Sequence, residues 1–61
     1  MTVDARAQCL IAGLSNNAYE HCRASTRFAL SIGNMEVSFV MAATAARIAQ
    51  LQADQAKDRG P

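Results

Sequence analysis

The sequence predicts an all-α protein, built as an antiparallel helical hairpin that pairs with a second copy of itself into a four-helix bundle. Three observations favour this fold. Helix-forming residues such as alanine, leucine, arginine and glutamine dominate the 61-residue chain, and its one proline is the last residue. Apolar residues recur at helical intervals of three and four positions. Because so short a chain forms one small domain with a limited core, we expect oligomerisation to supply part of its stability.

The first predicted helix spans residues 3–32. Thr2 suits its N-cap, and Asp4 places a carboxylate at the positive end of the helix dipole. Small and apolar side chains then form one helical face at positions 3, 7, 10, 11, 14, 18, 22, 25, 28, 29 and 32. The segment 13–17, GLSNN, disfavours helix and allows a kink. Since the apolar face keeps its phase across this segment, the pattern favours one continuous helix over two separate ones.

The predicted turn consists of Gly33 and Asn34. A glycine suits the left-handed residue just after a helix, and an asparagine suits the N-cap of the next helix, with Glu36 in its first turn. The second helix is therefore predicted at 35–57 and runs antiparallel to the first. Residues 58–61 are expected to fray.

The same turn resembles part of a DNA-binding helix-turn-helix, because the small residue Ala29 stands four positions before Gly33. A recognition helix needs polar and basic side chains in its early turns. The segment 35–41 instead contains one acidic residue, no basic one and mostly apolar side chains, which would meet a phosphate backbone unfavourably. We interpret the turn as a hairpin bend and expect no DNA binding.

Two apolar stripes run along the second helix. The first is a near-heptad series that packs along another helix, made of Val37, Val40, Met41, Thr44, Ile48, Leu51 and Gln55. The second is rich in alanine and consists of Met35, Phe39, Ala42, Ala46, Ala49 and Ala53. A helix that is apolar on several sides must be buried on several sides, and a lone hairpin covers only one. We therefore predict that the second stripe is the interface of a symmetric homodimer, with a higher oligomer as the alternative.

A second candidate surface lies at the edge of the first helix. Tyr19, Arg23, Arg27 and Leu30 flank its apolar face, and tyrosine and arginine are common at interaction hot spots, so these four are the predicted partner-binding residues. The arginines also allow contact with RNA. In size and inferred architecture the chain is similar to the small plasmid copy-number regulators, hairpin dimers that bind paired RNA loops, although fold alone does not carry function.

No group of residues in the sequence indicates a catalytic, cofactor or metal site. His21 is expected on the packed face of the first helix, where a single histidine usually makes a structural hydrogen bond. Cys9 and Cys22 lack metal-ligand spacing, and on a continuous helix they lie roughly 20 Å apart, too far for a disulfide. The formal charge of +1 gives no general attraction to nucleic acid or anionic membranes. We expect no enzyme.

A membrane span is also not expected, since the uncharged window between Glu36 and Arg47 holds ten residues and a span needs about 20. The N-terminal residues show no signal-peptide pattern, and two unpaired cysteines fit a reducing compartment, so a cytoplasmic location is predicted. The predicted function is a small regulator, inhibitor or adaptor that binds another protein, of a kind common among phage and accessory-gene products. A dimeric RNA-binding regulator and a structural assembly subunit are the alternatives.

Overall fold

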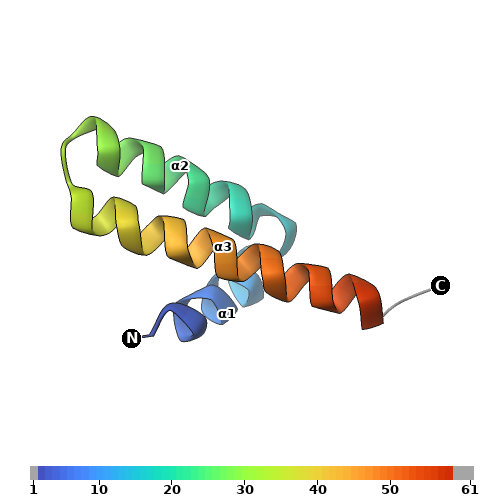
Figure 1. Cartoon of the computed structure of the whole chain (residues 1–61). Helices are drawn as coiled ribbons and strands as arrows, with labels where there is room; N and C mark the ends of the chain where they lie inside the picture. Colours follow the sequence, from blue (N-terminus) through green and yellow to red (C-terminus); the bar gives the residue numbers. More distant parts are fainter. Residues whose placement is uncertain (1, 59–61) are drawn as a thin grey trace.

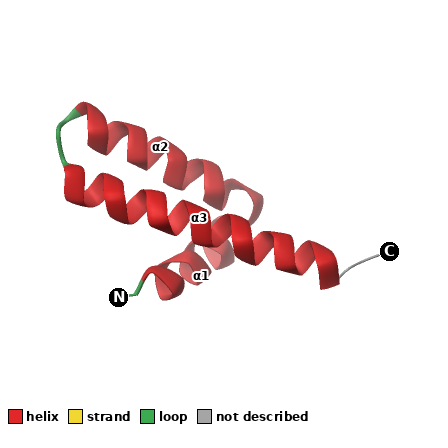
Figure 2. Ribbon diagram, in the orientation of Figure 1, coloured by secondary structure: helices red, strands yellow, loops and turns green. Residues whose placement is uncertain are grey.

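A computed structural model describes residues 2–58, and the secondary structure in this part of the chain is entirely helical (Figure 1, Figure 2). Helix α1 spans Val3–Leu14, a 3-10 turn η1 spans Ser15–Asn17, α2 spans Ala18–Ser31 and α3 spans Met35–Asp58. The predicted all-α hairpin is confirmed, since α2 and α3 pack side by side in opposite directions (Figure 1). Helix α1 crosses α3 at an angle and lies on a different side of it from α2.

The prediction of one continuous helix over 3–32 is wrong. The chain leaves the helix at Ser15, whose φ of 51° and ψ of −118° lie outside the helical region, within the weak segment 13–17. The Ser15 N–H still donates to the carbonyl of Ile11 and so closes α1. The side-chain amide of Gln52 donates to the Ser15 carbonyl at 2.9 Å, so α3 holds the bend in place. Because the helix breaks here, α1 folds back onto α3 instead of extending α2.

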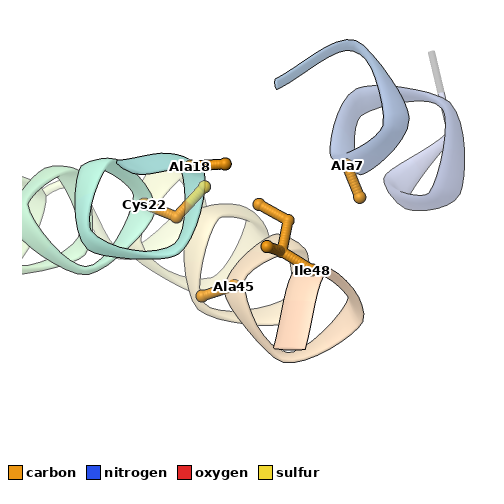
Figure 3. Close-up of a cluster of buried hydrophobic side chains, with 5 residues drawn as sticks. All are labelled: Ala7, Ala18, Cys22, Ala45 and Ile48. Carbon is orange, nitrogen blue, oxygen red and sulfur yellow. The ribbon is translucent and has the colours of Figure 1, made fainter. Parts of the chain in front are cut away.

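The core lies where the three helices meet, and small side chains dominate it. Its buried residues are Ala7, Ala18, Cys22, Ala45 and Ile48. Figure 3 shows Ile48 of α3 directed between Ala18 of α2 and Ala7 of α1. Around this cluster pack the partly buried Leu10, Ile11, Tyr19, Met41 and Leu51. Short side chains let the helices approach closely, but Ile48 is the one large apolar side chain of the cluster, so a single chain buries little apolar surface.

The hairpin turn has the predicted chemistry. Gly33 adopts a φ of 77°, and its N–H donates to the carbonyl of Leu30 at 3.1 Å. The N–H of Asn34 donates to the carbonyl of Ala29 at 2.8 Å, which completes a Schellman motif at the end of α2. The Asn34 Oδ1 then accepts from the N–H of Val37 at 3.2 Å and caps α3. The predicted roles of Gly33, at the end of one helix, and of Asn34, as the N-cap of the next, are therefore both confirmed.

The outer ends of the helices also follow local signals. Thr2 is the N-cap of α1, since its Oγ1 accepts from the N–H of Ala5 at 3.1 Å. Helix α3 begins at Met35 as predicted and includes Asp58. The rest of the tail for which fraying is predicted, 59–61, lies outside the described residues.

Candidate protein interaction surfaces

Large apolar side chains are exposed around the turn that joins α2 to α3. Six of them, between 44% and 77% exposed, are Phe28, Leu30, Ile32, Met35, Val37 and Phe39. We call this set the apolar tip. Large apolar side chains that gather in one region of a protein surface often mark an interaction site.

The second stripe of α3, here called the alanine stripe, is exposed along its whole length in the single chain. All six of its members are exposed: Met35, Phe39, Ala42, Ala46, Ala49 and Ala53. The first stripe behaves differently, because Thr44 and Ile48 at its centre are fully buried, and Ile48 packs in one cluster with residues of α1 and α2. Helices α1 and α2 thus cover two sides of α3 and leave the alanine stripe uncovered.

The predicted partner-binding residues adjoin the alanine stripe. A groove of about 370 Å³ between α2 and α3, here called the stripe-side groove, is lined by Tyr19, Arg23, Thr26, Arg27, Leu30, Ala42, Ala45 and Ala46. All four predicted partner-binding residues and two members of the predicted dimer interface therefore line one groove. The sequence places these residues on different helices, and only the packing of α2 against α3 shows that they share one surface.

Two arginines supply the charge of the stripe-side groove. Arg23 Nη1 donates to the Tyr19 Oη at 3.2 Å, and its guanidinium carbon lies 5.9 Å from the centre of the Tyr19 ring, within range of a cation–π contact. The side chain of Arg27 forms no hydrogen bond or ion pair with another described residue, and neither does the side chain of Glu20. The groove thus combines an oriented tyrosine, one engaged arginine and one arginine that is available to a partner.

Another groove lies on the opposite flank of the α2–α3 pair, and the sequence reasoning missed it. This open groove has a volume of about 610 Å³ and is lined by His21, Ala24, Ser25, Phe28, Ala29, Ile32, Asn34, Val37 and Met41. The placement of His21 on the packed face is wrong, because its side chain is exposed at the wall of this groove. The sequence pattern carries no signal for this groove, because how far α1 reaches toward the turn depends on the bend at Ser15.

Among the side chains that the structure describes, no three of His, Cys, Asp or Glu converge on a possible metal position. Cys9 is exposed and Cys22 is buried, and both are free thiols. Burial raises the pKa of the Cys22 thiol, and the positive charge of Arg6 opposes this rise. In the same part of the chain, no helix is both long enough and apolar enough to cross a membrane.

Comparisons with known protein families, with curated proteins and with solved structures find no match to this chain. Its function is therefore inferred from the surfaces described above.

Proposed function

We propose that the chain is a non-enzymatic interaction module that forms a homodimer and binds another protein as a regulator, inhibitor or adaptor. One observation carries this proposal: the alanine stripe leaves one side of α3 exposed along most of its length, and the apolar tip adds further exposed apolar side chains around the turn. Apolar surface of this extent is costly to leave in water and is typical of a contact surface. The two free thiols fit the reducing cytoplasm as its location.

The proposed dimer uses more than the apolar tip. Of the tip residues, Phe28, Ile32 and Val37 line the open groove on the flank opposite the alanine stripe and stay outside the dimer contact. Association costs roughly 4–15 kcal/mol, so the remaining tip residues, Leu30, Met35 and Phe39, need additional buried surface. The alanine stripe and the adjoining stripe-side groove supply it. In the proposed dimer the two α3 helices pack through their alanine stripes, each α2 flanks the contact, and Tyr19 and Leu30 extend it.

The RNA-binding alternative depends on Arg23 and Arg27. A phosphate backbone is held by several cations that together release counterions. In the stripe-side groove Arg23 is already engaged with Tyr19, and the rest of the lining is mostly apolar or small. These observations favour a protein partner. The assembly-subunit alternative requires growth beyond a dimer as the concentration rises.

A matched pair of charge substitutions tests the dimer. Ala46→Glu places a charge at the centre of the alanine stripe, and Ala5→Glu makes the same change at an exposed position of α1. We expect sedimentation equilibrium to give a dimer for the wild type and for Ala5→Glu, and a dissociation constant at least about tenfold higher for Ala46→Glu, since a buried unpaired charge is costly. Circular dichroism checks that both variants remain helical. Equal dissociation constants for the two variants would contradict the proposed interface.

A further inference from the structure

Helix α1 covers only half of the hairpin side on which it lies. It has 12 residues and is ~18 Å long, whereas α3 has 24 residues. In the C-terminal half of α3, Ile48 and Leu51 pack in one cluster with Ala7 and Leu10 of α1. Toward the turn, Val37 belongs to the same stripe of α3 but remains exposed. The first stripe of α3 therefore continues toward the turn beyond the part that α1 covers.

The open groove is this uncovered half. Met41 belongs both to the shell of the core cluster and to the lining of the groove, so the two are continuous. Ala29 is buried at the contact of α2 with α3, and Phe28 and Ile32 stand exposed at the edge of the groove. The groove is thus an extension of the site that α1 occupies, with the same two helices forming its sides.

The lining defines what the groove accepts. Apart from His21, no residue that lines it has an ionisable side chain, and the other polar residues are Ser25 and Asn34. A charged side chain inserted here would lose its hydration without gaining a partner of opposite charge. The element already bound on this side of the hairpin is a helix that inserts Ala7, Leu10 and Ile11, which are uncharged and stand at helical spacing. A second helix with an uncharged apolar face therefore fits the open groove, which is the uncovered part of this side.

We infer that the open groove binds an amphipathic helix of another protein, which lies in line with α1 and inserts an uncharged apolar face. This inference rests on the proposed function, because it names the surface that the heterologous partner uses. The alanine stripe and the stripe-side groove lie on the opposite flank of the α2–α3 pair. A second copy bound there leaves the open groove accessible, so dimerisation and partner binding are compatible.

Selection from a displayed library of peptides of about 14 residues, roughly four helical turns, tests this inference on the full-length chain. We expect the selected peptides to share three apolar residues at i, i+3 or i+4, and i+7, with no charged residue on that face. Two matched variants then locate the binding site. Phe28→Gln alters the edge of the open groove and Phe39→Gln alters the alanine stripe, and the two phenylalanines are 66% and 77% exposed.

For the selected peptides, Phe28→Gln should raise the dissociation constant about tenfold or more, and Phe39→Gln should leave it unchanged. Val37→Gln, on the α3 side of the groove, provides a second variant with the same expected effect if Phe28→Gln loses its helical circular dichroism spectrum. Peptides that instead depend on Phe39 would overturn the inference and leave the proposed dimer surface to be judged by its own test. Recovery of no helical peptide would also overturn it. Binding that depends on Phe28 in a chain that sediments as a monomer would support the inference and refute the dimer.

Discussion

Arg47 of α3 and Asp4 of α1 form an ion pair that ties the start of the chain to its central helix. Arg47 Nε donates to the Asp4 Oδ1 at 2.6 Å. Gln8 donates to the other carboxylate oxygen at 2.8 Å, and Arg47 Nη1 donates to the side-chain carbonyl of Gln50 at 2.8 Å. Together with the bond from Gln52 to the Ser15 carbonyl, this network holds both ends of α1 on α3.

Loss of the ion pair should destabilise the protein only slightly. The two side chains are 37% and 47% exposed, and ion pairs at such positions contribute roughly 0–1 kcal/mol because water and salt screen them. A double-mutant cycle with Asp4→Asn and Arg47→Gln, measured by urea unfolding, should give a coupling energy of about 0.5 kcal/mol that falls in high salt. A coupling above about 2 kcal/mol would contradict the exposed geometry.

The two described glycines should respond to alanine with opposite signs. A Cβ at Gly13 or Gly33 would meet no atom within 4 Å, so only backbone conformation distinguishes the sites. Gly33 has a φ of 77°, and Gly33→Ala should lower the free energy of unfolding by about 1–2 kcal/mol. Gly13 is helical, and Gly13→Ala should raise it by about 0.5–1 kcal/mol. Thermal unfolding measures both changes, and shifts of equal sign would contradict this reading of the turn.

The bend at Ser15 carries backbone strain that glycine should relieve. Its φ of 51° with ψ of −118° is a conformation that glycine adopts far more easily than serine. Strain of this kind costs of order 1–3 kcal/mol, part of which the greater freedom of glycine in the unfolded chain offsets. Ser15→Gly should therefore stabilise the protein by up to about 1 kcal/mol in urea unfolding. Asn16→Gly, at a position without positive φ, is the control and should destabilise it.

Stability should fall at alkaline pH through Cys22. Burial raises the pKa of its thiol in the folded protein, so the folded state favours the protonated form. The stabilisation is complete below the pKa of the unfolded thiol, about 8.5, and is lost as the pH rises from there through the pKa of the folded thiol. Between about pH 8 and 10 the wild type should therefore lose more unfolding free energy than Cys22→Ala does. Cys9→Ala, at the exposed cysteine, should keep the slope of the wild type.

The helix caps and the turn were predicted correctly, because each depends on residues that are close together in the sequence. The Thr2 cap, the Gly33 turn and the Asn34 cap each depend on a side chain or backbone preference that acts within five positions. The centre of the first stripe was also predicted, since burial of Ile48 follows from its helical spacing. The alanine stripe is exposed in the single chain, as a dimer interface would be. Its pairing with a second copy stays a prediction.

The break at Ser15 and the open groove could not be derived from the same patterns. Helical periodicity reports which side of a helix is apolar, and Ala7 and Ala18 fit the same apolar face whether or not the axis bends between them. The pattern therefore could not show that the chain turns back at 15–17. How far α1 then reaches along α3 depends on that bend, and in the structure α1 leaves Val37 and His21 exposed.

The central claim is that the alanine stripe of one copy contacts the alanine stripe of another. An isotope-filtered nuclear Overhauser experiment on a mixture of labelled and unlabelled chains measures contacts between copies directly. The proposed dimer predicts intermolecular signals from the ring of Phe39 and the methyl groups of Ala42, Ala46 and Ala49, and none from Val37 in the open groove. Absence of intermolecular signals, or signals confined to the open groove, would contradict the claim.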